Sequence, residues 1–375
     1  MQYQLTREFY KSFARHLISS GFKSLNDFGL YSPDNPKINY IVEKEDWSVR
    51  WDGKYISTNI NKNSKELIGL STFPANIFNR IVHFGSHYMW LNWESSLNKS
   101  NKYVVTYFHG KPEDGKAARK QIEHFIDSSK SIDYVVTAAT VIEKRLQDWG
   151  IPKDKIIKIP LGVDTENFSP IGNEEKTKLR KKLGIPDDCY VIGSFQKDGV
   201  GWGDGMEPKL IKGPDIFVKA MERLSKHFNI FVLLTGPARG YVKKELERLN
   251  IPYLHKYASH YPDLNKYYRV LDAYLVASRE EGGPKAILES MASGVPIVST
   301  NVGMAEDVIL NRVNGYIVPV ADHIKLSNIL GELLGSHKSR ENIRTNAFGT
   351  IKKYDWNVVA EQYLDRVYKP LINNM

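Results

Sequence analysis

A turn between two glutamates is the part of this sequence best suited to chemistry. It reads Glu281-Gly-Gly-Pro-Lys-Ala-Ile-Leu-Glu289, after a strand-like run at 273–277 and into a helix-like run at 286–293. A strand-to-helix turn offers unpaired backbone N–H groups and the positive end of a helix dipole, which together bind anions such as phosphate. Ionised carboxylates only accept hydrogen bonds, so the two acids suit sugar hydroxyls. A phosphate held beside hydroxyls predicts a nucleotide-sugar site.

The residues inside this turn have backbone properties that fit such a site. Gly282 and Gly283 permit close approach of a ligand to the backbone and dihedral angles that other residues avoid. Pro284 fits the first turn of a helix, where its missing N–H costs nothing. The spacing alone also fits a plain connector in which Glu281 is an acid favoured by the helix dipole.

Length and composition place this site in an ordinary globular chain. The 375 residues are enough for two domains, and 42% hydrophobic with 25% charged residues is typical of soluble proteins. The single cysteine, Cys189, excludes a disulfide framework or a cysteine-based metal site and favours a reducing, cytoplasmic compartment. We expect no signal peptide and no membrane span, because no apolar run approaches about 18 residues.

The net charge of +9 has two interpretations. It fits attraction to phosphate-bearing substrates or to the anionic inner face of a membrane, and it equally fits a solvated, lysine-rich surface. No dense basic run and no aromatic–basic repeat accompanies it, so we do not expect a nucleic-acid partner.

Strand-like and helix-like runs alternate along the chain. The expected strands cover residues 38–42, 67–70, 80–84, 103–108, 134–138, 156–159, 190–193, 230–234, 273–277, 296–300 and 315–318. The expected helices cover a first segment with Leu5, Phe9, Phe13 and Leu17 that stops at Gly21, then 117–128, a helix ending at Trp149, 215–224, 241–249, 286–293 and 324–334. Asp52-Gly53 is expected to turn a hairpin at 51–55.

This alternation predicts an α/β fold with parallel sheets covered on both faces. Right-handed crossovers give two Rossmann-like, doubly wound domains that face a cleft, with ligands at the carboxyl ends of the strands. We place an N-terminal domain at 1–163 and a second domain at 164–355, because the connection at 160–170 is rich in turn residues. Residues 356–375 follow as a C-terminal helix with apolar residues at helical spacing.

Several stretches around the glutamate turn resemble retaining, nucleotide-sugar-dependent glycosyltransferases with the GT-B fold. The turn and the following Ser-Met-Ala-Ser-Gly294-Val-Pro296 look like the Glu-x7-Glu signature of that family. Lys212-Gly resembles its Lys-Gly motif, and Leu234-Thr-Gly236-Pro resembles its second glycine turn. The resemblance covers roughly residues 155–320, is weak before residue 100, and implies that the C-terminal helix crosses back onto the N-terminal domain.

The resemblance implies a role for each matching residue. Glu289 would hold the ribose hydroxyls of the nucleotide, and Glu281 would face hydroxyls of the donor sugar. The backbone of two turns would line the sugar and the diphosphate, at Gly282, Gly283, Pro284, Lys285 and Ala286 and at Gly236.

Basic residues would stabilise the departing diphosphate, because cleavage of a sugar–phosphate bond builds negative charge there. Lys212 is the main candidate. The family's arginine is replaced by Ser194-Phe-Gln-Lys197, so Lys197 or Lys209 is expected to supply the charge, although a lysine cannot copy the bidentate grip of arginine. A surface lysine is the alternative for each. The glycine-rich stretch 198–206 fits a mobile lid, a phosphate loop or a flexible connector.

His109 follows the strand 103–108, and the resemblance places it near the anomeric carbon of the donor. A structural turn histidine is the alternative. His83 and His87 are expected to be structural, and Trp90 and Trp93 are expected in the core rather than against a glycan.

The resulting hypothesis is a glycosyltransferase that transfers a hexosyl group. It takes the sugar from a UDP- or GDP-linked donor to a glycan or lipid-linked acceptor, as in the synthesis of cell-surface polysaccharide or glycolipid. We expect no metal and no other cofactor, because the sequence lacks an Asp-x-Asp pattern and clustered histidines. Open alternatives are a GT-B phosphorylase or epimerase, a non-catalytic nucleotide-sugar-binding protein, and a basic nucleic-acid-binding or membrane-binding module. The strand and glycine-rich loop that usually open the family's first domain are not recognisable in this chain.

Overall fold

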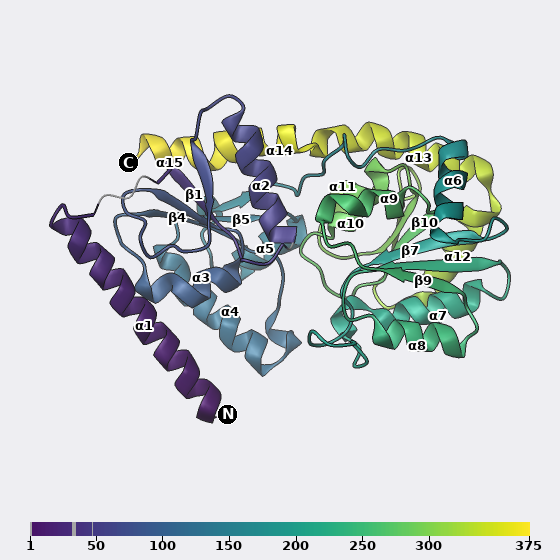
Figure 1. Cartoon of the computed structure of the whole chain (residues 1–375), viewed down its shortest axis with the longest axis horizontal. Helices are drawn as coiled ribbons and strands as arrows, with labels where there is room; N and C mark the ends of the chain where they lie inside the picture. The colour runs from purple at the N-terminus through teal and green to yellow at the C-terminus, as the bar shows by residue number, and fades with distance from the viewer. Residues whose placement is uncertain (1, 32–34, 47) are drawn as a thin grey trace. The chain divides into compact units, whose positions relative to one another are not determined.

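The chain forms two compact units in a computed structural model that describes residues 2–31, 35–46 and 48–375 (Figure 1). The first unit contains residues 1–159 and 356–375, and the second contains residues 160–355. The division therefore falls between Ile159 and Pro160, whereas the sequence placed it after residue 163. Among the described residues, no helix combines the length and the apolar character needed to cross a membrane.

The first unit is built on a parallel six-stranded sheet in the order β2-β1-β3-β4-β5-β6. Its strands are β1 (Ile38–Ile41), β2 (Ile68–Ser71), β3 (Ile81–Phe84), β4 (Lys102–Thr106), β5 (Tyr134–Thr137) and β6 (Ile156–Lys158). Its helices are α1 (Gln2–Asp27), α2 (Ser48–Asn61), α3 (His87–Trp93), α4 (Lys116–Ser128), α5 (Thr140–Asp148), α14 (Trp356–Tyr363) and α15 (Lys369–Asn373). Every residue of β1 and β3 is buried, as expected for strands of a parallel sheet with both faces covered.

The second unit repeats the design, with a parallel six-stranded sheet in the order β12-β11-β10-β7-β8-β9. Its strands are β7 (Tyr190–Phe195), β8 (Ile230–Thr235), β9 (Tyr253–Lys256), β10 (Ala273–Val276), β11 (Ile297–Thr300) and β12 (Tyr316–Val318). Its helices are α6 (Asn173–Leu183), α7 (Pro214–Leu224), α8 (Gly240–Arg248), α9 (Asn265–Tyr268), α10 (Lys285–Ala292), α11 (Ala305–Val308), α12 (His323–Gly335) and α13 (His337–Ile351). The predicted α/β fold with two doubly wound parallel sheets is confirmed.

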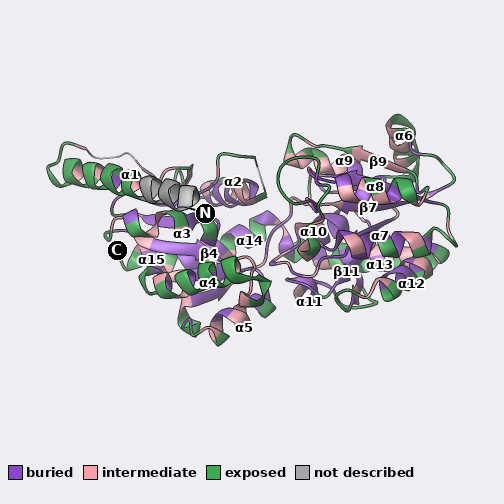
Figure 2. Ribbon diagram, turned by 90° about the horizontal axis from the view of Figure 1, so that it is seen from below, coloured by how far each residue is buried: buried purple, intermediate pink, exposed green. Residues whose placement is uncertain are grey.

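The core of the second unit lies between its sheet and the inner faces of its helices. Figure 2 shows buried surface along β7 and β11 and on one side of α7. On α7 the buried positions include Phe217, Met221 and Leu224, which recur at helical spacing, so the apolar stripe of the helix covers the sheet.

The predicted hairpin at 51–55 is wrong, because these residues lie in α2. Gly53 sits on the buried side of the helix, where a Cβ would lie 2.8 Å from Tyr40 Cδ1 and 2.9 Å from Leu70 Cδ2. The glycine of this Asp-Gly pair therefore lets a helix approach the sheet closely instead of turning a hairpin.

The first helix also differs from its prediction. We expected it to stop at Gly21, but α1 continues to Asp27. A Cβ at Gly21 would meet nothing within 4 Å, and one glycine costs a helix only about 1 kcal/mol. The side chains of the predicted apolar positions Leu5 and Phe9 lie outside the described residues.

The C-terminal segment packs within the first unit. The rings of Trp356 on α14 and Tyr55 on α2 are stacked with centroids 5.4 Å apart. Val359, Tyr363 and Val367 are buried in the same core as β1 and β3. The apolar spacing predicted for this segment thus marks its buried face.

Candidate functional site

The candidate donor site lies where the strand order of the second unit reverses. β7 and β10 are neighbours in its sheet, and the following strands of each run lie on opposite sides of this pair. In doubly wound folds, ligands bind beyond the carboxyl ends of the strands at such a point. The segment 196–213 leaves the carboxyl end of β7, and the glutamate turn leaves the carboxyl end of β10 before α10 begins at Lys285.

Lys212 and Glu281, both predicted as catalytic, form an ion pair in this structure. Lys212 Nζ donates to both carboxylate oxygens of Glu281 at 2.7 Å. Ser278 Oγ also donates to Glu281 Oε1 at 2.8 Å. The side chains are only 20% and 11% exposed, so this is a fixed, partly desolvated pair. The geometry places a cation and a carboxylate together at the carboxyl end of β10.

The two other predicted lysines lie close to this pair. Desolvation, followed by the positive charges of Lys212 and Lys197, lowers the pKa of Lys209, while Glu281 opposes the shift. Lys197 Nζ lies 3.3 Å from the ring centroid of Trp202, and desolvation lowers its pKa as well. Lys209 therefore feels the positive charges of Lys212 and Lys197 and the negative charge of Glu281.

The glycine-rich stretch after Lys197 is a hairpin tied to a neighbouring helix. Lys209 N donates to Asp198 O at 2.7 Å and Val200 N donates to Glu207 O at 2.9 Å, which closes its base. Gly240 N and Tyr241 N, at the start of α8, donate to Asp204 O and Gly205 O. These bonds tie the segment to the start of α8.

A buried ion pair holds the base of the hairpin. Arg239 Nε lies 2.9 Å from Asp198 Oδ1, and the two side chains are 0% and 2% exposed. Arg239 also donates to Ser194 O at 2.6 Å and Thr235 O at 2.8 Å, at the ends of β7 and β8. A Cβ at Gly205 would lie 2.2 Å from Ala238 O, so the hairpin can reach this position only with glycine there.

Glu289 is buried on α10, and two tyrosines hold its carboxylate. Tyr268 OH donates to Oε2 at 2.7 Å, and Tyr261 OH donates to Oε1. Burial raises the pKa of Glu289, while these hydrogen bonds and the charge of Lys285 oppose the rise. Lys285 Nζ also lies 5.1 Å from the centroid of the Tyr261 ring. A solvated helix acid is therefore excluded for Glu289.

The glycines of the turn do not serve unusual dihedral angles, because neither Gly282 nor Gly283 has a positive φ. A Cβ at Gly283 would lie 2.8 Å from Leu161 Cδ1. Gly303 has a φ of +52°, and a Cβ there would lie 2.7 Å from Gly282 O. Pro284 is the residue that caps α10, one position before the predicted first turn. Lys285 and Ala286 are the first two residues of that helix, where backbone N–H groups lack helical partners.

Gly236, the remaining predicted donor-binding residue, follows β8 with a φ of +86°. A Cβ there would lie 3.0 Å from Gln196 O and 3.6 Å from Lys197 N. Gly236 O accepts a hydrogen bond from His255 Nε2 at 2.8 Å. The glycine turn after β8 thus packs directly against the chain that leads to Lys197.

His109 belongs to the first unit, three residues after β4 ends at Thr106. His83 is buried, with Nδ1 2.7 Å from Tyr368 OH and Nε2 2.9 Å from Thr106 Oγ1. Burial lowers the pKa of His83 to about 3, and burial together with the charge of His109 lowers the pKa of His87 to about 3. Trp90 is 1% exposed and donates from Nε1 to Ser128 Oγ. His83, His87 and Trp90 are therefore structural, as predicted.

Sequence reasoning missed several residues that shape the site. Tyr261 and Tyr268 hold Glu289, Ser278 holds Glu281, and Asp198 with Arg239 holds the hairpin. Of these residues, only Ser278 could have been proposed from the sequence, because it lies in the short segment between β10 and Glu281. In the parts of the chain that the structure describes, no group of three or more His, Cys, Asp or Glu is placed to hold a metal ion.

Known proteins resemble the part of the chain that carries Lys212 and the glutamate turn. Residues 207–350 match the family of glycosyl transferases group 1. The D-inositol 3-phosphate glycosyltransferase of Xylanimonas cellulosilytica is 30% identical over 229 residues, which cover 58% of this chain and 52% of that protein. The N,N'-diacetylbacillosaminyl-diphospho-undecaprenol alpha-1,3-N-acetylgalactosaminyltransferase of Campylobacter jejuni is 27% identical over 233 residues, or 61% of this chain and 58% of that protein. The chain thus spans a little over half the length of these two relatives.

Solved structures share the fold. The crystal structure of HepE from Anabaena in complex with UDP and glucose has a TM-score of 0.71 at 16% identity, over 89% of this chain and 99% of that chain. Sucrose-phosphate synthase from Thermosynechococcus elongatus has a TM-score of 0.65 at 17% identity, over 92% of this chain and 88% of that chain. These similarities establish a fold of the GT-B class for this chain.

Proposed function

We propose that this chain is a retaining glycosyltransferase that moves a hexosyl group from a UDP- or GDP-linked donor to a hydroxyl of a glycan or a lipid-linked acceptor. The observation that carries the proposal is the ion pair between Lys212 and Glu281 at the β7/β10 switch point, with N–O distances of 2.7 Å. The family match at 207–350 covers the same turn. The retained stereochemistry and the donor chemistry rest on the resemblance of the Glu281–Glu289 segment.

The lysine cluster is suited to a departing diphosphate. Negative charge builds on the leaving oxygen as the sugar–phosphate bond breaks, and fixed cations lower the barrier to that step. Lys212 is already oriented by Glu281, and Lys197 and Lys209 add positive charge beside it. We therefore propose that these lysines neutralise the diphosphate without a metal ion.

The carboxylates are suited to hydroxyl groups. Tyr261 and Tyr268 each donate one hydrogen bond to a different oxygen of Glu289, and each oxygen keeps a second acceptor position. A ribose with two neighbouring hydroxyls fits these remaining positions. Glu281 Oε1 accepts from both Lys212 and Ser278, and Oε2 accepts from Lys212. From the resemblance, Glu281 is proposed to receive hydroxyls of the donor sugar, and His109 is proposed to lie near the anomeric carbon.

The acceptor class is supported by the names of the relatives. One acts on D-inositol 3-phosphate, and another on a diphospho-undecaprenol-linked saccharide. Both acceptors carry phosphate and hydroxyl groups. We propose an acceptor of this kind, in the synthesis of cell-surface polysaccharide or glycolipid.

A thermal-shift screen with UDP-, GDP-, ADP- and TDP-sugars tests the donor half of this proposal. A donor present at a hundred times its dissociation constant should stabilise the fold by about 2.7 kcal/mol. Glu289→Gln and Lys212→Ala should reduce the shift, whereas Lys219→Ala, which removes an exposed charge from α7, should leave it unchanged. If none of the four nucleotides shifts the wild-type protein, the proposal is wrong. Binding without sugar transfer to any acceptor would instead indicate a non-catalytic nucleotide-sugar-binding protein.

A further inference from the structure

A cavity lies at the opposite end of the strands from the candidate donor site. It has a volume of about 290 Å³, and its walls come from four segments, at 170–176, 269–272, 293–296 and 337–344. Residues 271 and 272 precede β10, and residues 295 and 296 precede β11, so the cavity lies at the amino ends of these strands. Because the strands are parallel, the glutamate turn lies at the opposite ends.

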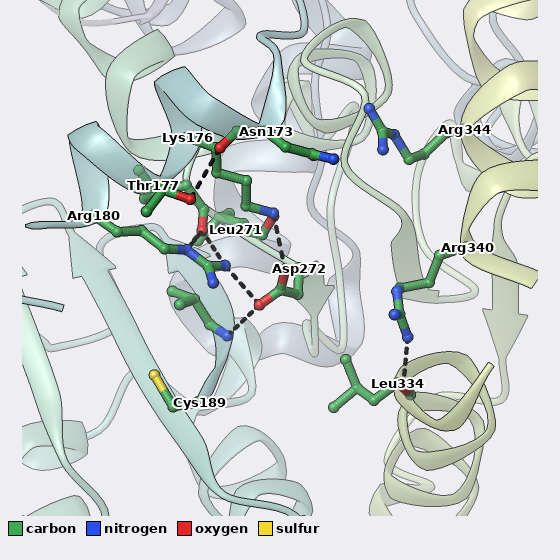
Figure 3. Close-up of polar contacts among 12 residues, drawn as sticks. Asn173, Lys176, Thr177, Arg180, Cys189, Leu271, Asp272, Leu334, Arg340 and Arg344 are labelled. Carbon is green, nitrogen blue, oxygen red and sulfur yellow. Dashed lines mark hydrogen bonds and ion pairs between the residues drawn. The ribbon is translucent and has the colours of Figure 1, made fainter. Parts of the chain in front are cut away.

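The walls of this cavity carry more positive than negative charge. Four lysine and arginine side chains line it, against the carboxylates of Asp272 and Glu341. Figure 3 shows Lys176 and Asp272 on one side and Arg340 with Arg344 on the other. The basic side chains are Lys176, Arg269, Arg340 and Arg344.

The carboxylate of Asp272 is already neutralised by basic residues of α6. Lys176 Nζ lies 2.9 Å from Asp272 Oδ1, and Arg180 Nη2 lies 2.6 Å from Oδ2. Val191 N also donates to Oδ2 at 2.8 Å. Asp272 therefore has no capacity left to balance the arginines across the cavity.

The arginines of the cavity are held mainly by neutral groups. Arg340 Nη1 donates to the carbonyls of Leu333 and Leu334 at the end of α12. Arg269 donates to the backbone oxygen of Asn167 and to the backbone oxygen and the hydroxyl of Ser169. Neither of these two arginines has an acidic partner among the described residues.

Arg344 is the arginine best placed to bind a ligand. Its Nη1 donates to Glu341 Oε1 at 2.7 Å, but the Glu341 side chain is 47% exposed, so this surface pair is weak. Gly294 has a φ of +67°, and a Cβ there would lie 3.6 Å from Arg344 Nε. The guanidinium of Arg344 thus lies directly against the turn 293–296 that lines the cavity.

A buried hydroxyl without a partner lies in the same turn. Ser293 is 4% exposed, and its Oγ has no hydrogen-bond partner among the residues that the structure describes. A buried polar group left in this state costs about 1–3 kcal/mol. Ser293 is among the residues that line the cavity, and a ligand that reached its Oγ there would satisfy this hydroxyl.

We propose that this cavity is a second anion site, which binds the phosphate group of a small phosphorylated molecule independently of the donor site. Guanidinium groups match phosphate oxygens with paired N–H donors, and a serine hydroxyl adds a further donor. The volume of about 290 Å³ accommodates a phosphate with a group of about the size of one sugar ring. Desolvation, with Arg180 and Arg344 adding to it and Asp272 opposing, lowers the pKa of Lys176, and a bound phosphate would counter this shift.

Calorimetric titration of the full chain with inorganic phosphate and with a hexose phosphate, at constant ionic strength, tests the proposal. Arg344→Ala should weaken binding of both probes about tenfold, because it removes charge-assisted hydrogen bonds. Lys338→Ala removes an exposed charge from the same helix without lining the cavity and should leave binding unchanged. Glu341→Gln removes the competing carboxylate and should tighten binding several-fold, which a loss of folding cannot imitate.

Lys212→Ala separates this cavity from the donor site, since it acts only on the latter and should leave phosphate binding here intact. The proposal is overturned if Arg344→Ala and Glu341→Gln both bind the probes as the wild type does. It is equally overturned if Lys212→Ala abolishes binding, which would assign the phosphate to the donor site. Binding of inorganic phosphate with no gain for the hexose phosphate would restrict the site to the free ion and contradict the proposed ligand.

Discussion

Replacing Glu281 with glutamine should tighten the binding of a nucleoside diphosphate while it slows sugar transfer. Glu281 holds Lys212 Nζ at 2.7 Å through both carboxylate oxygens. A diphosphate that reaches the ammonium must share it with this carboxylate and must lie near a like charge. Glutamine keeps the shape of the side chain and removes that charge.

The size of the effect follows from the geometry. A phosphate oxygen on the far side of the ammonium would lie about 5–6 Å from the carboxylate, roughly twice the measured N–O distance. Two unit charges at that distance repel by about 0.8 kcal/mol in water and about 3 kcal/mol at an effective dielectric constant of 20. The side chains are 20% and 11% exposed, so the pair lies between these limits. We expect UDP or GDP to bind about tenfold more tightly, equal to about 1.4 kcal/mol.

Isothermal titration of UDP and GDP into the wild type, Glu281→Gln and Lys212→Ala measures this effect. Lys212→Ala should move affinity in the opposite direction, and Lys219→Ala serves as the control for an exposed charge on α7. The gain in Glu281→Gln should be larger at low salt, because it is electrostatic. If Glu281→Gln weakens diphosphate binding as much as Lys212→Ala does, Glu281 acts by positioning the lysine, and the reasoning given above is refuted.

Other predictions concern the supports of the site and the first unit. Asp198→Ala should destabilise the fold by about 3–5 kcal/mol, because it leaves the buried Arg239 unpaired; a urea midpoint close to that of the wild type would contradict this. Gly53→Ala should lower the free energy of unfolding by about 1–3 kcal/mol through overpacking, although alanine favours helices. A variant that is more stable in urea than the wild type would show that α2 does not pack this closely on the sheet. Burial lowers the pKa of His83 to about 3, so its contribution to stability is present above about pH 6.5 and is lost as the pH falls toward 3, by about 1.4 kcal/mol per pH unit. His83→Gln should therefore flatten the fall in stability between pH 6 and 4, and an unchanged slope would count against a neutral buried imidazole. Burial raises the pKa of Glu289, so its contribution is present below its unfolded pKa and is lost as the pH rises through the folded one. The stability of Glu289→Gln relative to the wild type should thus rise from pH 4.5 to 7, and a constant difference in urea unfolding would contradict an ionisable, desolvated carboxylate.

The fold could be predicted from the sequence because its strands are short apolar runs. The segments between them have apolar residues at helical spacing. The runs at 190–193, 230–234 and 273–277 correspond to β7, β8 and β10 within two residues at each end. The Asp52-Gly53 pair was misleading, because the same glycine that suits a hairpin also suits close packing of a helix on a sheet. Local signals cannot distinguish these cases without the neighbouring Tyr40 and Leu70.

The site could be predicted only in part, for a related reason. Lys212 and Glu281 each carry a sequence signal, and the fold brings them within hydrogen-bond distance. The pairing of Glu289 with Tyr261 and Tyr268 depends on how α9 and the segment before it pack on α10, which no local pattern encodes. The anchoring of the hairpin at 198–209 on the start of α8 is likewise a long-range contact, whereas its glycines alone also fit a flexible connector.

Transfer of sugar from labelled donors tests the central claim most directly. The wild type, Lys212→Ala and Lys219→Ala would be supplied with UDP- and GDP-linked hexoses and with lipid-linked and inositol phosphate acceptors, and both the glycosylated product and the released diphosphate would be measured. Sugar transfer by the wild type and by Lys219→Ala, with a rate lower by a factor of about 10²–10³ in folded Lys212→Ala, is the predicted result. A folded Lys212→Ala variant that transfers sugar at the rate of the wild type would contradict the role of the lysine at the leaving diphosphate.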